Sequence, residues 1–323
     1  MDYRALILEA RANVAAASYS PKKLTFLHTG VVAAAGLVVA VLSYLLNIGI
    51  GETGGLGGIG PRAALETAQT MLQLLSAVLT PFWTMGFLAA ALGYADRGSP
   101  TPRTLLSGFS CWGPVLRLLL LQMGIYFGVS LLMMQFGSVL YAMSPAVNRF
   151  YGLLEQLDPT LSMDAESLLL SLEQLEAGEL TRIVLGMLPY YLIPVGAAAL
   201  YLSYRMRFAP YLLMCFPRMG ALLAITQSFR LTKGKCVALL KLDLRFWWFY
   251  LMEVLVGVLC YGDLVLAAFG VDWGNIGWLA SLLFYILALA VQIGLYVWKK
   301  PEVYTSYALF FKSLLPRQET NHQ

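Results

Sequence analysis

The chain has 323 residues, of which 59% are hydrophobic and only 12% charged, and its mean hydropathy is +0.69. Soluble domains are far less apolar, and the apolar residues here form runs long enough to cross a bilayer, so the composition indicates an integral membrane protein. The net charge of +4 does not predict a nucleic-acid partner, because the basic residues flank the apolar runs.

Residues 1–25 are predicted to form a cytoplasmic amphipathic segment. Within residues 3–17, Leu6, Ala10 and Val14 share one helical face, with arginines close by. This pattern is typical of a short helix that lies in the headgroup region of a membrane.

Residues 26–299 contain six apolar runs and are predicted to form an all-α bundle of six transmembrane helices. Pro81, Pro189 and Pro194 lie inside these runs and predict helix kinks, because proline removes a backbone hydrogen bond. Between the third and fourth runs, the acidic insertion 144–182 predicts one extracytoplasmic amphipathic helix. The six runs cover residues 26–50, 68–94, 114–143, 183–204, 242–261 and 276–298.

The distribution of positive charge predicts the orientation of the bundle. With six crossings and a cytoplasmic start, only Arg62, Arg149 and Arg182 of the 22 Lys and Arg residues fall in outer segments. Short cytoplasmic loops carry the excess of Lys and Arg in membrane proteins. The N-terminus and the C-terminus are therefore both predicted to be cytoplasmic, and residues 300–323 are predicted to form a cytoplasmic tail whose apolar-aromatic stretch lies against the inner face.

A second interfacial helix is predicted on the cytoplasmic side, over residues 219–233, with Gly234 suited to end it. Basic side chains follow along this helix and into the fifth run. They anchor the chain among headgroups or form a pocket for a lipid headgroup or a substrate, and the interfacial helix is also suited to dock a cytoplasmic partner. These basic residues are Arg230, Lys233, Lys235, Lys241 and Arg245.

Glu253 lies near the middle of the fifth run, where a carboxylate is costly unless it is paired, protonated or wetted. No cation lies one turn away on its own helix, so a partner has to come from another helix. Gln292 on the sixth run and Gln122 or Gln135 on the third run are the available polar side chains. Glu253 is either part of a proton or cation relay, or a neutral group that holds two helices together by hydrogen bonds.

Several segments of the chain resemble one known family. Arg207–Leu213 reads RFAPYLL, Ala224–Lys235 reads AITQSFRLTKGK and Glu302–Phe311 reads EVYTSYALFF, and Gly86–Phe109 also fits. These segments resemble a bacterial family of six-helix membrane proteins, domain of unknown function 975. The resemblance implies a membrane fold in the bacterial cytoplasmic membrane and no particular activity, and the insertion 144–182 departs from the family pattern.

The sequence predicts no enzyme. Four cysteines without a CxxC pair and two histidines without neighbouring ligands predict no metal site, cofactor or catalytic triad. The first hypothesis is a non-catalytic module that binds membrane lipids, a cytoplasmic protein or a second copy of itself and supports envelope or transport physiology, with Glu253 buried and bonded. The alternative is a transporter or channel for a small solute, with a wet cavity that reaches Glu253.

Overall fold

The computed structural model describes residues 2–53, 59–145, 147–148, 152, 177–260, 262 and 277–315. Most of these residues are helical, and the described part of the chain contains no strand. The chain divides into two compact units. The first contains residues 1–119 and 207–323, and the second contains residues 120–206.

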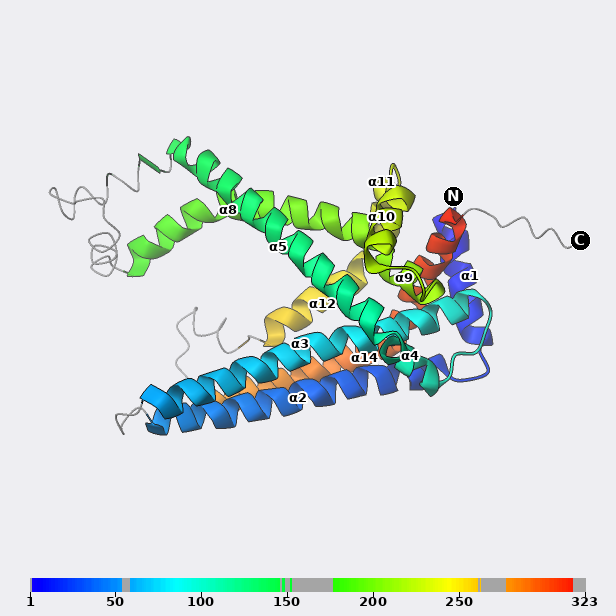
Figure 1. The fold of residues 1–323 in the computed structure, drawn as a ribbon, viewed down its shortest axis with the longest axis horizontal. Coiled ribbons are helices and arrows are strands. Elements are labelled where there is room, and N and C mark those ends of the chain that lie inside the picture. The colour runs from blue at the N-terminus through cyan, green and yellow to red at the C-terminus, as the bar shows by residue number, and fades with distance from the viewer. Residues whose placement is uncertain are drawn as a thin grey trace, which may run out of the picture. The chain divides into compact units, whose positions relative to one another are not determined.

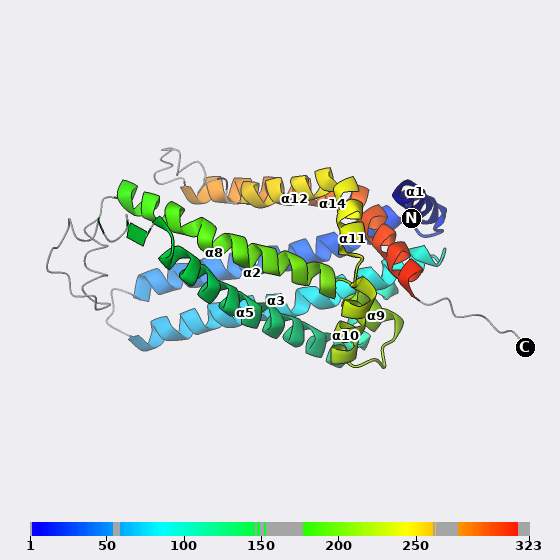
Figure 2. The ribbon, with the colours of Figure 1, turned by 90° about the horizontal axis from the view of Figure 1, so that it is seen from above.

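Three long helices form the body of the first unit: α2 (Pro21–Thr53), α3 (Ile59–Ala95) and α14 (Gly277–Leu314). They run side by side, and α12 (Trp247–Cys260) lies along α14 (Figures 1 and 2). The short α1 (Tyr3–Ala16) packs against α14 and α3. Buried side chains of α2, α3 and the segment after α3 form a hydrophobic cluster, which consists of Leu24, Phe87, Ala90, Tyr94 and Leu105.

One close packing joins α3 to the segment after it. That segment holds η1 (Pro102–Leu106) and α4 (Ser107–Ser110). A Cβ atom on Gly86 would lie 1.9 Å from the Leu105 carbonyl oxygen, and one on Gly108 would lie 2.1 Å from the Phe82 carbonyl oxygen. Only glycine allows the two backbones to approach this closely.

Within the first unit, three short helices precede α12 in the chain. α9 (Ala209–Cys215) contacts α3 and α10 (Ala221–Thr232), and α11 (Cys236–Arg245) follows. The C-cap of α10 is Lys233, and Gly234 after it has a φ of +71°, in the left-handed region that favours glycine.

The second unit consists of α5 (Trp112–Ala142) from residue 120 onward and of α8 (Ala177–Met206). α5 and α8 pack closely at Gly137, where an added Cβ atom would lie 2.7 Å from the Tyr190 carbonyl oxygen. α8 is helical through Pro189 and Pro194, as α3 is through Pro81.

Five helices of the described part are long and apolar enough to cross a membrane, in agreement with a multi-pass membrane protein. The predicted fifth run, 242–261, is instead divided: α11 ends at Arg245, Phe246 leaves the helical conformation, and α12 has 14 residues. The five spans are Pro21–Val39, Ala63–Ala95, Trp112–Ala142, Leu185–Cys215 and Leu283–Leu314.

The helix that contains the predicted sixth run, residues 276–298, is longer than that run. α14 continues through Pro301 to Leu314, so the apolar-aromatic stretch is part of this helix. Tyr307, Phe310 and Phe311 of this stretch are buried, and the rings of Phe310 and Phe311 pack against the ring of Phe208. The proposed amphipathic helix of the acidic insertion lies, for the most part, outside the described residues.

Candidate functional site

A hydrogen-bonded ion pair is the centre of the candidate site. Arg207, between α8 and α9, donates through Nη1 to Oδ2 of Asp243 on α11 at 2.8 Å, and through Nη2 to the Tyr250 hydroxyl on α12 at 3.2 Å. The Tyr307 hydroxyl on α14 donates to the other oxygen of Asp243. The guanidinium carbon of Arg207 lies 4.0 Å from the Tyr307 ring centroid.

The two tyrosine hydroxyls close the network. Their oxygens are 2.5 Å apart, and because Tyr307 gives its proton to Asp243, Tyr250 donates to Tyr307. The side chains of Arg207 and Asp243 are only 22% and 17% exposed. A charge in such a place is costly unless it is paired and its remaining polar atoms are bonded, and this network meets that requirement.

A cavity of about 210 Å³ lies beside this network. Its wall combines one guanidinium, one carboxylate, four tyrosines and a phenylalanine. The cavity lies within the first unit, between α3, α9, α12 and α14. The lining residues are Thr84, Leu88, Arg207, Tyr211, Phe249, Tyr250, Glu253, Tyr304 and Tyr307.

Glu253 is the lining carboxylate, and its partners come from α14. Its side chain is half-buried and lies beside the Tyr296 hydroxyl, to which Gln292 donates at 3.4 Å. Glu253 is also an electrostatic neighbour of Lys300. Two of the predicted polar residues, Glu253 and Gln292, therefore meet through Tyr296, which was not among the residues proposed from the sequence.

Lys300 is a buried cation held among aromatic rings. The residue is 8% exposed. Its Nζ atom lies 4.3 Å from the Tyr296 ring centroid, 5.1 Å from that of Phe87 and 5.6 Å from that of Tyr304. Such contacts with the negative ring faces stabilise an ammonium that has lost its water. The sequence predicted that Lys300 begins the cytoplasmic tail, because it follows the predicted end of the sixth span.

The other two polar candidates belong to the second unit. Gln122 is half-buried and Gln135 exposed, both on α5.

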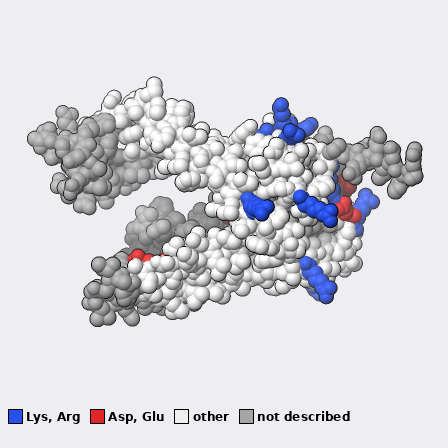
Figure 3. Space-filling model, in the orientation of Figure 1, with Lys and Arg blue, Asp and Glu red and all other residues white. Residues whose placement is uncertain are grey.

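The predicted basic residues form an exposed surface on α10, α11 and the turn between them, here called the basic face. Figure 3 shows the cationic side chains of this region at the top of the molecule. All five are exposed: Arg230, Lys233, Lys235, Lys241 and Arg245. Large apolar side chains are also exposed along the same helices, namely Leu222, Leu223, Val237, Leu240 and Leu244.

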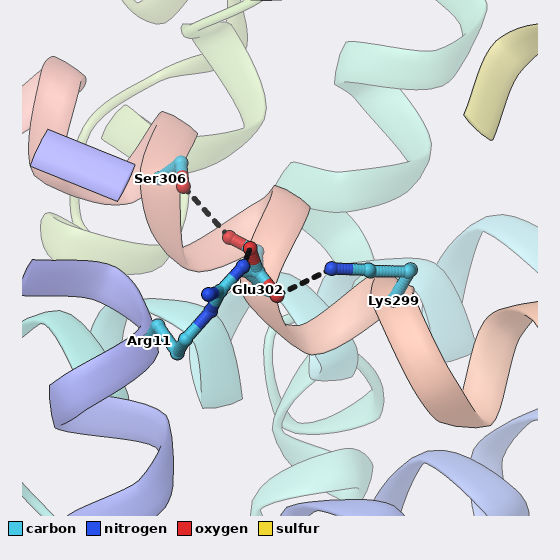
Figure 4. Close-up of polar contacts among 4 residues, drawn as sticks. All are labelled: Arg11, Lys299, Glu302 and Ser306. Carbon is cyan, nitrogen blue, oxygen red and sulfur yellow. Dashed lines mark hydrogen bonds and ion pairs between the residues drawn. The ribbon is translucent and has the colours of Figure 1, made fainter. Parts of the chain in front are cut away.

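A second polar cluster joins α1 to α14 (Figure 4). Arg11 donates to Oε1 of Glu302 at 2.9 Å, and Lys299 donates to Oε2 at 3.0 Å. The Ser306 hydroxyl donates to the backbone carbonyl of Glu302 at 2.8 Å. Both carboxylate oxygens are thus occupied, and this arrangement fixes one helix to another.

Among the described residues, no group of His, Cys, Asp and Glu has the arrangement of a metal site. No curated protein and no solved structure matches the chain. A family model described as "Protein of unknown function (DUF975)" matches residues 18–318, so the chain belongs to that family, with which its sequence motifs agree.

Proposed function

We propose that this protein is a non-catalytic membrane module that binds anionic lipid through its basic face. The observation that carries the proposal is the mixture of exposed cations and exposed large apolar side chains on α10 and α11. Lys and Arg near an anionic membrane surface contribute roughly 1 kcal/mol each to binding. The apolar side chains between them suit the boundary between headgroups and acyl chains.

The packing of the first unit supports a module of this kind. The largely buried charges of Arg207 and Asp243 are bonded to each other, Glu253 lies beside Tyr296, and Lys300 lies among rings. Because Asp243 belongs to α11, this packing also fixes the position of α11 and so of its part of the basic face.

Binding to the basic face can be tested with matched pairs of lysines. The full chain is purified in detergent, titrated with phosphatidylglycerol, and the bound lipid per chain is counted by native mass spectrometry. We expect Lys233→Gln/Lys235→Gln to lower retention of phosphatidylglycerol. Lys22→Gln/Lys23→Gln removes the same charge from two exposed positions on α2 and is the control. Equal losses in both double variants would refute the basic face as the site.

We also propose that both termini are cytoplasmic in a bacterial membrane. α12 leads away from the α11 end of the first unit and α14 returns to it (Figures 1 and 2), so the two helices make an outward and a return path. The positive charge of the α10–α11 region favours the cytoplasmic side. A Lys233→Cys variant, with the four native cysteines changed to serine, is expected to resist an impermeant thiol reagent in intact cells. Labelling without permeabilisation would refute this orientation.

A second candidate function is transport of a small solute. It is favoured by one observation, the cavity that Glu253 and Arg207 border. Transport coupled to Glu253 predicts that Glu253→Gln abolishes solute-dependent proton flux in liposomes that contain the full chain. Flux equal to that of the wild type would remove Glu253 from any such mechanism.

A further inference from the structure

The charges at the cavity are balanced. Arg207 and Glu253 both line it, Asp243 pairs with Arg207, and Lys300 is the electrostatic neighbour of Glu253. Two cations and two carboxylates therefore occur together. A ligand with a net charge would upset this balance in a place where an uncompensated charge is expensive.

A ligand that carries both charges avoids this cost. Its acidic group is attracted to Arg207 and its ammonium to Glu253, so each end meets an opposite charge within one cavity. Most of the remaining wall is aromatic, and tyrosine and phenylalanine rings favour an ammonium group close to them. The aromatic residues of the wall are Tyr211, Phe249, Tyr250, Tyr304 and Tyr307.

The size of the cavity restricts the ligand further. At about 210 Å³ it is smaller than the range of roughly 300–1,000 Å³ that is usual for drug-sized ligands. It is also much larger than the ~30 Å³ that one water molecule occupies in the liquid. A group of only a few non-hydrogen atoms fits such a space.

We propose that this cavity binds a small zwitterion that joins an ammonium to a phosphate or carboxylate. An ethanolamine phosphodiester has this chemistry and no net charge, whether as the head of a phospholipid or as a free molecule. The site is separate from the basic face, since none of the five basic residues lines the cavity.

The test uses the purified full chain in detergent with equal amounts of phosphatidylethanolamine and phosphatidylglycerol. The protein is washed at about 1 M salt, where the screening length falls to about 3 Å and binding to exposed cations is suppressed. The lipid that remains is then quantified per chain. We expect the wild type to retain phosphatidylethanolamine, and retention of neither lipid, or of both equally, overturns the proposal for a lipid headgroup.

Glu253→Gln locates the ligand. Loss of the carboxylate is expected to lower retention of phosphatidylethanolamine by about tenfold, the effect of losing one charge-assisted hydrogen bond. Glu9→Gln is the matched control, because Glu9 is exposed on α1. Undiminished retention by Glu253→Gln contradicts the proposal.

A second variant covers the case in which Glu253→Gln fails to fold. Thr84→Met keeps every charge and narrows the cavity from α3, and it is expected to lower retention as well. Retention by Thr84→Met equal to that of the wild type contradicts the proposal. Lys233→Gln/Lys235→Gln is expected to keep phosphatidylethanolamine, so failure of this site and failure of the basic face give different results.

sn-Glycero-3-phosphoethanolamine, a phosphodiester with no net charge, is added to the lipid-free wild type to distinguish the two sources. If calorimetry shows that this compound binds the wild type with a lower Kd than it binds Glu253→Gln, the ligand is a free zwitterion. No binding of this compound, together with Glu253-dependent retention of the lipid, assigns the headgroup. Absence of both overturns the inference.

Discussion

Arg207 and Asp243 lie 36 residues apart in the chain and form an ion pair with 2.8 Å between Nη1 and Oδ2. The pair connects the residue that enters α9 to the last turns of α11, and the hydroxyls of Tyr250 and Tyr307 bond to it from α12 and α14. Four segments of the first unit are therefore held at one point. Substitutions in this network are therefore expected to lower the free energy of unfolding by a measurable amount.

The first prediction concerns Asp243→Asn. The change keeps the shape of the side chain but leaves the largely buried guanidinium of Arg207 without its anion, so we expect a loss of about 3–5 kcal/mol in the free energy of unfolding. The loss is measured as a lower midpoint of unfolding in detergent. Lys241→Gln changes an exposed charge on the same helix and serves as the control. Equal midpoints for Asp243→Asn and wild type would show that the pair contributes nothing to stability.

The second prediction concerns Tyr307→Phe. This variant removes the hydroxyl that bonds to both Asp243 and Tyr250 while it keeps the ring under Arg207. We expect a smaller loss than for Asp243→Asn, about 1–2 kcal/mol, because no charge is left unpaired. Tyr201→Phe, at an exposed position on α8, is the control in the same unfolding measurement. A loss as large as that of Asp243→Asn would mean that the ring position has shifted.

The helices of the bundle could be predicted from the sequence, because long apolar runs between charged segments identify them. The interruption at Phe246 could not, since no glycine or proline marks it within the apolar and aromatic run. The extension of α14 past Pro301 was missed for the opposite reason. Two lysines and a proline there are typical of the end of a span, and only the three-dimensional packing shows that rings and Glu302 accommodate these lysines.

The candidate site was predicted in part. Glu253 was identified because a carboxylate in an apolar run is unusual. Arg207 and Tyr307 lie in the segments that resemble the family, but nothing in one sequence indicates that they meet Asp243. Contacts between residues 36 and 64 positions apart depend on how the helices pack, and periodicity along one helix carries no information about that.

The third prediction concerns Gly86→Ala in α3. A Cβ at this position would lie 1.9 Å from the Leu105 carbonyl oxygen, so the backbone of α3 or of η1 has to move. We expect a loss of at least about 1–3 kcal/mol, the usual cost of overpacking. Gly30→Ala in α2 is a matched control, because its Cβ meets nothing within 4 Å and alanine favours a helix by about 1 kcal/mol. The two variants should therefore shift the unfolding midpoint in opposite directions, and a shift in the same direction would contradict the close packing of α3 on η1.

The fourth prediction concerns the link between α1 and α14. Arg11 is 59% exposed, whereas Glu302 is 11% exposed and bonds to both Arg11 and Lys299. Arg11→Gln removes only an exposed partner and is expected to cost less than about 1 kcal/mol. Glu302→Gln removes the anion of two cations and is expected to cost about 2 kcal/mol, because hydrogen bonds to charged groups are the stronger ones. Hydrogen exchange measures the effect locally: the amides of α1 should lose more protection in Glu302→Gln than in Arg11→Gln, while those of α2 stay as they are. Equal loss of protection in α1 in both variants would contradict this prediction.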